Sequence, residues 1–108
     1  MSAKTISLTV FEAIMLVTQS TGKTVLRDDI ENYNDDSLEI KRWRMVAIKT
    51  MVEFGMTTQQ IIRYMKLPSG IIKTLKGLQD DIISISMRKK VSGEMINIVK
   101  RNNDVVHP

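Results

Sequence analysis

The sequence predicts an all-α fold, a small multi-helix domain in which two short helices follow one another across a tight turn and which assembles into oligomers. Three observations support this prediction. Only two prolines occur in 108 residues, so long stretches are free of helix breakers. Apolar side chains recur every three or four residues, which is the periodicity of a helix with one buried face. The composition, 43% apolar and 26% charged, is ordinary for a globular chain.

Length and pattern divide the chain into one domain and a tail. A chain of 108 residues has the size of a single domain. We expect this α-helical domain to span residues 1–101, with the two short helices at about 57–78, and we expect residues 102–108 to form a flexible tail. The tail includes His107, which is the single histidine of the chain.

The first helix is expected over residues 8–19. Thr9 and Glu12 have the spacing of a capping box, in which two side chains satisfy free backbone N–H groups at the start of a helix. Apolar residues surround most of the helix, which is typical of a helix buried on several sides. In so small a chain this pattern favours a subunit interface as readily as a core. The residues assigned to that interface are Phe11, Ile14 and Met15.

Two further helices are expected before Gly55. Glycine commonly ends a helix because it adopts left-handed geometry without steric cost. The first is short and covers residues 25–32. The second is long, covers residues 38–54 and is capped by Asp36 or Ser37. Its apolar stripe consists of Ile40, Trp43, Ala47, Met51 and Phe54, and its basic side consists of Lys41, Arg42, Arg44 and Lys49.

The two short helices carry the most informative pattern. Thr57 and Gln60 form a second capping box. The pair Leu67-Pro68 interrupts the helix that follows, because a residue before proline is pushed out of helical geometry. Ser69 can cap the next helix, over residues 70–78. Two short helices joined by such a turn form a helix-turn-helix. The residues expected to fill the space between the helices are Ile61, Ile62, Met65, Leu67, Ile72 and Leu75.

This spacing resembles that of bacterial helix-turn-helix DNA-binding regulators. Such regulators usually have glycine in the turn where this chain has Lys66, so we expect a lysine in left-handed geometry there, at a cost of about 1 kcal/mol. The exposed side of helix 70–78 contains no Arg, Asn or Gln, the side chains that pair bidentately with guanine or adenine. The simpler interpretation of the pattern is an ordinary helical hairpin within a bundle.

The charge distribution favours the DNA-binding interpretation. Residues 1–40 have a net charge of −4 and residues 41–108 a net charge of +8. A basic half indicates an anionic partner, and nucleic acid is the first candidate. A solvated basic face is the alternative, above all for the long helix. The residues expected at DNA are Arg63, Lys66, Ser69, Lys73, Thr74 and Lys76, with Lys41, Arg42 and Arg44 as additional phosphate contacts.

A longer stretch, Phe54–Ser86, has three features in common with a known family. They are the hydrophobic-glycine pair Phe54-Gly55, the turn Leu67-Pro68 and the apolar pair Ile82-Ile83. On these points the stretch is similar to the flagellar master-regulator family, in which one subunit holds zinc with cysteines. Because this chain has no cysteine, it resembles the non-zinc subunit. The resemblance implies an α-helical oligomer that activates transcription together with a partner chain.

The pattern is weaker after residue 80. Residues 82–87 alternate partly as a strand does, yet they can also continue a helix. We favour the helix, since no second strand is available to pair with this one. A last helix is expected over residues 93–100, with Ser92 as its cap.

The composition also argues against several function classes. The absence of cysteine removes disulfides, thiolate metal sites and thiol nucleophiles. With one histidine, a single chain cannot build a histidine triad or a histidine metal cage, so we expect no enzyme, no cofactor and no metal site. No apolar run reaches the roughly 20 residues of a membrane span. We therefore expect a cytoplasmic protein without a membrane partner.

Together these features predict a DNA-binding transcriptional regulator. It would bind double-stranded DNA with helix 70–78 at the major groove, as a homo-oligomer or together with a second regulator subunit. The alternative is an α-helical protein–protein interaction module, an adaptor or anti-factor that docks its first helix on an acidic partner and does not bind DNA.

Overall fold

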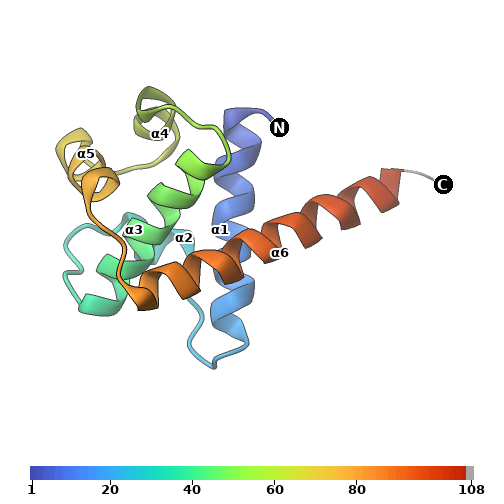
Figure 1. Ribbon diagram of the computed structural model, residues 1–108, viewed down its shortest axis with the longest axis horizontal. Helices are drawn as coiled ribbons and strands as arrows, with labels where there is room; N and C mark the ends of the chain where they lie inside the picture. Colours follow the sequence, from blue (N-terminus) through green and yellow to red (C-terminus); the bar gives the residue numbers. More distant parts are fainter. Residues whose placement is uncertain (107–108) are drawn as a thin grey trace.

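The computed structural model describes residues 1–106 and the side chains of residues 1–103, and it is all-helical (Figure 1). No strand forms within the described residues, so the predicted fold class is confirmed at this level. In chain order the helices are α1 (Ala3–Gln19), α2 (Arg27–Glu31), α3 (Leu38–Glu53), α4 (Thr58–Tyr64), α5 (Ser69–Gly77) and α6 (Ile82–Val106).

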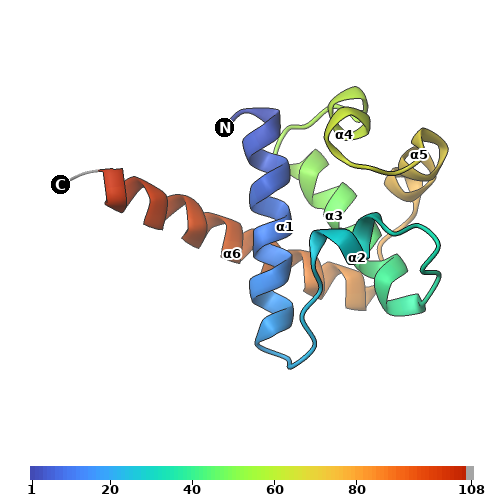
Figure 2. The same cartoon turned by 180° about the vertical axis from the view of Figure 1, so that it is seen from behind.

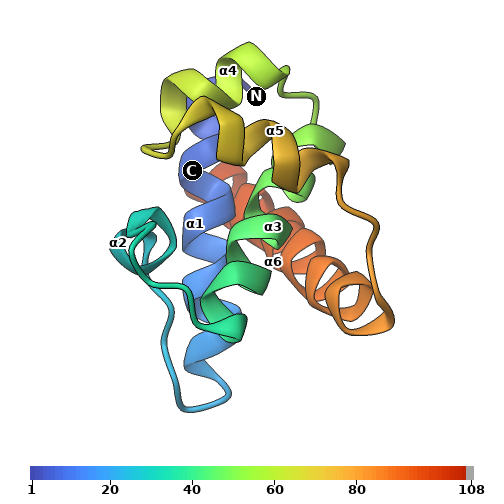
Figure 3. The same ribbon diagram turned by 90° about the vertical axis from the view of Figure 1, so that its left-hand side faces the viewer.

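Helix α3 lies at the centre of the arrangement. It contacts every other helix, whereas the most extensive single contact joins α1 to α6. Seen from both sides, α6 crosses α1 and then projects beyond the rest of the molecule (Figures 1 and 2). The short helices α4 and α5 lie together at the other end, where both pack against α3 (Figure 3).

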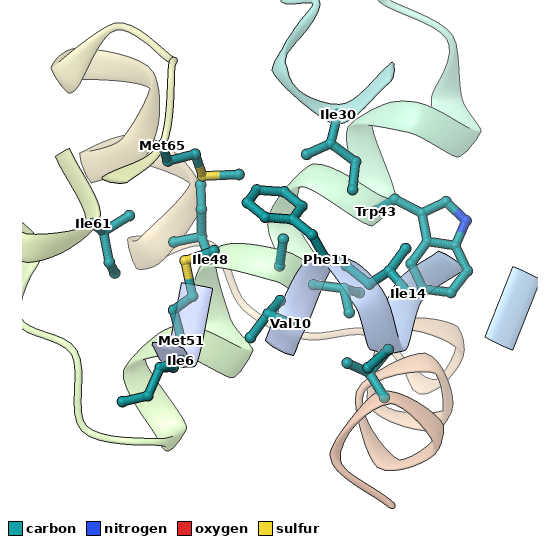
Figure 4. Packing of buried hydrophobic residues seen from close by; sticks show 14 of the residues in the cluster. Ile6, Val10, Phe11, Ile14, Ile30, Trp43, Ile48, Met51, Ile61 and Met65 are labelled. Carbon is teal, nitrogen blue, oxygen red and sulfur yellow. The ribbon is translucent and has the colours of Figure 1, made fainter. Parts of the chain in front are cut away.

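The core forms where α1 and α3 meet the short helices (Figure 4). Val10 and Ile14 from α1 are fully buried, as are Ile48 and Met51 from α3. Ile61 is fully buried on the α4 side of the same cluster. Burial of each side chain of this size contributes roughly 1.5–3 kcal/mol, so the contact of α1 with α3 is a major source of stability.

Helix α1 begins five residues earlier than the sequence predicts. Its cap is Ser2, whose Oγ accepts a hydrogen bond from the Thr5 N–H at 3.2 Å. The predicted capping box at Thr9 is wrong, because Thr9 lies inside the helix, is buried, and donates its hydroxyl to the Thr5 carbonyl at 2.7 Å. The hydroxyl is satisfied within the helix, and Thr9 therefore marks no boundary.

Most of the apolar circumference of α1 is covered within a single chain, although Leu8 remains exposed. Phe11 and Ile14 retain 6% and 0% of their accessible surface and belong to the core cluster, while Met15 is half-buried. Helices α3, α4 and α6 all pack on α1. The assignment of Phe11 and Ile14 to a subunit interface is thus corrected, because both side chains are used in the core of the chain itself, whereas the assignment of Met15 stays a prediction.

Helix α6 is one continuous helix. The sequence leaves helix or strand open for residues 82–87 and predicts a separate helix over residues 93–100. Asp81 caps it, with Oδ1 accepting from the Ser84 N–H at 2.7 Å, so the strand alternative for residues 82–87 is excluded. The predicted cap Ser92 lies in mid-helix and donates instead to Glu53 Oε2 at 3.1 Å. The helix also includes residues 102–106, where a tail was expected, whereas residues 107–108, with His107, lie outside the described part.

Arg44, predicted as a phosphate contact, is a buried structural residue. It keeps 5% of its accessible surface. Its Nε donates to the Ile30 carbonyl at 2.8 Å, and its Nη2 donates to the carbonyls of Asn32 and Asp35 at 2.8 and 3.2 Å. Burial lowers the pKa of the guanidinium, while the charge of Asp35 acts in the opposite direction. Arg44 therefore holds α2 and the loop after it against α3.

We expect Arg44→Met to destabilise the protein by about 3 kcal/mol, because three buried or half-buried carbonyls lose a charged donor. Urea unfolding followed by circular dichroism measures the change. The matched control is Lys41→Met, which removes an exposed charge less than one turn away and should change stability by less than about 0.5 kcal/mol. Equal effects of the two substitutions would contradict the structural role of Arg44.

The cap of α6 predicts a pH dependence. The Ser84 N–H, helped by the Ser84 side chain and by Arg42, holds the pKa of Asp81 below its usual range. The charged carboxylate therefore stabilises the fold above the unfolded pKa of about 3.9, and this contribution is lost as the pH falls through the folded pKa. Wild type should be more stable than Asp81→Asn at pH 7 by a margin that shrinks towards pH 3. A margin that does not change with pH would count against the cap.

Candidate nucleic-acid interface

The α4–α5 pair is built by local sequence signals and by apolar contacts with α3. The capping box predicted at the start of α4 is present, with Gln60 N–H donating to Thr57 Oγ1 at 3.2 Å and Thr57 N–H donating to Gln60 Oε1 at 2.9 Å. The predicted inner residues are mostly buried, since Ile61 and Ile72 are inaccessible and Leu67 retains 8% of its surface. Both helices are therefore fixed relative to α3 by packing.

The turn between α4 and α5 differs from the expected geometry. Within residues 1–106 only Gly22 and Gly55 have a positive φ, so Lys66 is not left-handed and carries no such strain. Met65 makes the reversal in extended geometry, with φ −121° and ψ 123°. The Lys66 N–H then donates to Glu31 Oε2 at 2.6 Å. The expected cap Ser69 is also corrected, because α5 starts at Ser69 itself, with Pro68 as the residue before it.

All six predicted DNA contacts lie on the outside of this pair. Arg63 is exposed near the end of α4, and Lys66 is exposed in the turn. Ser69, Lys73, Thr74 and Lys76 are exposed along α5. Two of them have partners within the chain: Thr74 donates its hydroxyl to the Gly70 carbonyl at 2.9 Å, and Lys76 Nζ donates to Thr58 Oγ1 at 2.5 Å.

The three additional phosphate contacts predicted on α3 differ in their exposure to solvent. Lys41 is exposed. Arg42 is half-buried and forms an ion pair with Asp81 at 3.1 Å. Arg44 is buried, as described above. Lys49, on the same basic side, donates to the Leu78 carbonyl and lies 3.6 Å from Asp80. Of this basic side, only Lys41 is left with its charge open to solvent.

The cations of α4 and α5 lack carboxylate partners. Seven ion pairs occur among the described residues, and none involves Arg63, Lys66, Lys73 or Lys76. No acidic residue occurs between Glu53 and Asp80. Ion pairs with carboxylates occur instead at Arg27, Arg42, Arg88 and Arg101. The α4–α5 surface therefore carries a net positive charge.

Small residues on α5 are a feature that sequence reasoning did not assign to the site. Gly70 and Gly77 lie on its exposed side, and a Cβ at either position would meet no atom within 4 Å. Neither glycine has a positive φ, so neither is required by the backbone. Gly70, Thr74 and Gly77 are spaced so that they share one side of α5. This spacing could have indicated, from the sequence alone, a helix side that carries only small side chains.

The remaining surface of the described residues offers hollows lined largely by apolar side chains. Two apolar grooves flank the exposed Leu38; the larger has a volume of about 610 Å³ and is lined in part by Trp43 and Met87. No group of three metal-ligating side chains occurs among the described residues. None of the helices there combines the length and hydropathy needed to span a membrane.

Comparison with known proteins gives no further assignment. No protein-family model, no curated protein and no solved structure matches the chain. Function is therefore inferred from the residues of the α4–α5 surface.

Proposed function

We propose that this protein is a DNA-binding transcriptional regulator whose α4–α5 pair acts as a helix-turn-helix. The observation that carries the proposal is the group of four exposed cations, Arg63, Lys66, Lys73 and Lys76, none of which has a carboxylate partner within the described residues. Cations that the fold does not neutralise are available to replace counterions on DNA phosphates.

The shape of α5 is compatible with the major groove. A helix with its side chains is roughly 10–12 Å across, and the groove of B-form DNA is about 12 Å wide. Ser69, Gly70 and Thr74 are small, so the backbone of α5 can approach base edges closely. Lys73 and Lys76 lie on the same helix and Lys66 in the turn before it, which supports a clamp on phosphates around the inserted helix.

The same side chains indicate weak direct reading of sequence. Lysine and arginine contacts to phosphate position a protein but carry no base information. On the exposed side of α5, the groups that could hydrogen-bond base edges are the hydroxyls of Ser69 and Thr74 and the ammonium groups of Lys73 and Lys76. Specificity would then come from DNA shape, from repeated half-sites or from a partner subunit. The resemblance to the non-zinc subunit of the flagellar master regulators predicts such a partner subunit, and this remains a prediction.

The alternative is a protein-interaction module that does not bind DNA. The sequence based this alternative on docking of the first helix, whereas the structure favours it for another reason. Docking through the apolar face of α1 loses its main support, because Val10, Phe11 and Ile14 are buried in the core. What favours an interaction module is Leu38, which is 71% exposed between two apolar grooves. The DNA-binding experiments below separate the two functions, because a pure interaction module would show no affinity for duplex DNA.

We expect Lys73→Glu combined with Lys76→Glu to lower the affinity for duplex DNA at least about tenfold and to reduce the salt slope by about two. Fluorescence anisotropy with labelled DNA measures both quantities, and circular dichroism checks the helix content. The control is Lys4→Glu with Lys90→Glu, which changes the net charge equally on exposed positions of α1 and α6. If the control loses as much affinity as the test variant, α5 is not the contact.

We expect Gly70→Glu to separate stability from DNA binding. A side chain at this position meets no atom within 4 Å, and a carboxylate in the first turn of α5 favours the helix, so stability should rise by about 1 kcal/mol. The same carboxylate would repel DNA phosphates at close range. Thermal unfolding and anisotropy give the two readouts. A variant that is more stable and binds DNA unchanged would show that this end of α5 does not face DNA.

A further inference from the structure

Helix α6 has an exposed stripe that the fold does not use. Ile82, Ile85 and Ile96 are 86%, 42% and 48% exposed. They belong to a series with alternating steps of three and four residues, which is the spacing of a coiled-coil seam. The full series is Ile82, Ile85, Lys89, Ser92, Ile96 and Val99.

The stripe is distinct from the face that packs inside the chain. The buried residues of α6 include Val91, Met95 and Ile98, and α6 makes its most extensive contact with α1. The exposed stripe turns away from these residues along the same helix. Four of its members, Ile85, Lys89, Ser92 and Ile96, line one surface groove together with Glu53 of α3.

We propose that this stripe binds the same stripe of a second copy, with the two α6 helices antiparallel. The register places Ile85 opposite Ile96 of the other copy and Ile82 opposite Val99. The inner pair is Lys89 opposite Ser92. Every apolar member of the stripe then meets an apolar member.

Charge complementarity selects this arrangement over a parallel one. The Ser92 hydroxyl donates to Glu53 Oε2 at 3.1 Å, so a Glu53 carboxylate lies beside the position that Lys89 of the other copy would occupy. Glu53 is 46% exposed and its ion pair with Arg88 is long, at 3.6 Å, so it can accept a further cation. Two Lys89–Glu53 pairs would form. A parallel pair would instead bring Lys89 against Lys89, and like charges in register repel.

The shape of the molecule leaves room for the second copy. Gly93 lies next to Ser92 in the same groove, and nothing lies within 4 Å of where its Cβ would be, so the helices can approach closely at their centre. The far end of α6 projects from the body (Figures 1 and 2). In an antiparallel pair this end lies along the start of α6 of the other copy.

The first test is the mass of the full chain in solution, measured by light scattering over a range of concentrations. We expect twice the chain mass of 12.3 kDa. Ile96→Glu should raise the dimer dissociation constant about 100-fold or more, because it places a charge against Ile85. The control Ile83→Glu changes an equally exposed isoleucine off the stripe and should leave the dimer intact. A wild-type chain that stays monomeric at every concentration overturns the proposal.

The second test determines the register of the two α6 helices by disulfide cross-linking. Because the chain has no cysteine of its own, any disulfide must form between the introduced cysteines. Ile85→Cys and Ile96→Cys chains should form a disulfide with each other when mixed and oxidised, whereas neither should cross-link alone. In the proposed register the two copies of residue 85 are about 16 Å apart along the axis, far beyond the reach of a disulfide. Cross-linking of either variant alone, without cross-linking of the mixture, overturns the antiparallel register.

These tests are independent of DNA binding. If the chain is monomeric and binds DNA, the α6 dimer is refuted and the proposed DNA-binding function stands. If the chain is a dimer without affinity for DNA, the proposed function is refuted and the α6 dimer stands.

Discussion

The arrangement of the whole molecule depends on the burial of α3. Val46, Ala47, Ile48 and Met51 are inaccessible to solvent, and the helix touches every other helix. A helix surrounded in this way has few positions for charge, yet α3 carries Arg44 and Lys49. Each is tolerated because backbone carbonyls accept from it, of Ile30, Asn32 and Asp35 for Arg44 and of Leu78 for Lys49. The bonds of Arg44 also hold α2 and the loop after it against α3, and the bond of Lys49 holds the segment that follows α5.

The fold thereby gives several of its basic residues different surroundings. Arg42, Lys49 and Arg88 face Asp80, Asp81 or Glu53 and serve to fix α6 against α3. The cations of α4 and α5 face no carboxylate. The net charge of +4 conceals this difference, because it sums the paired cations of the scaffold, exposed lysines such as Lys41 and Lys90, and an α4–α5 surface that holds no carboxylate. That α4–α5 surface is the physical basis of the proposed DNA contact.

Local signals predicted local structure well, and contacts between distant residues account for most of the errors. The capping box at Thr57, the cap at Ser37 and the left-handed Gly55 follow from neighbouring residues and are confirmed. Arg44 was misassigned because its carbonyl partners come from α2 and the loop after it, which helical periodicity cannot place. Phe11 and Ile14 were misassigned because the sequence does not say that three other helices cover α1. The cap at Ser92 failed for a similar reason, since Glu53 is its partner.

The decisive measurement is the salt dependence of duplex DNA binding by the full chain. Four phosphate contacts predict that duplex DNA is bound near 50 mM salt and that log K falls with log[salt] at a slope of about −3.6 per chain. Fluorescence anisotropy across several salt concentrations gives the slope. Absence of binding near 50 mM salt, or an affinity that does not depend on salt, would mean that the cations of α4 and α5 do not contact phosphate.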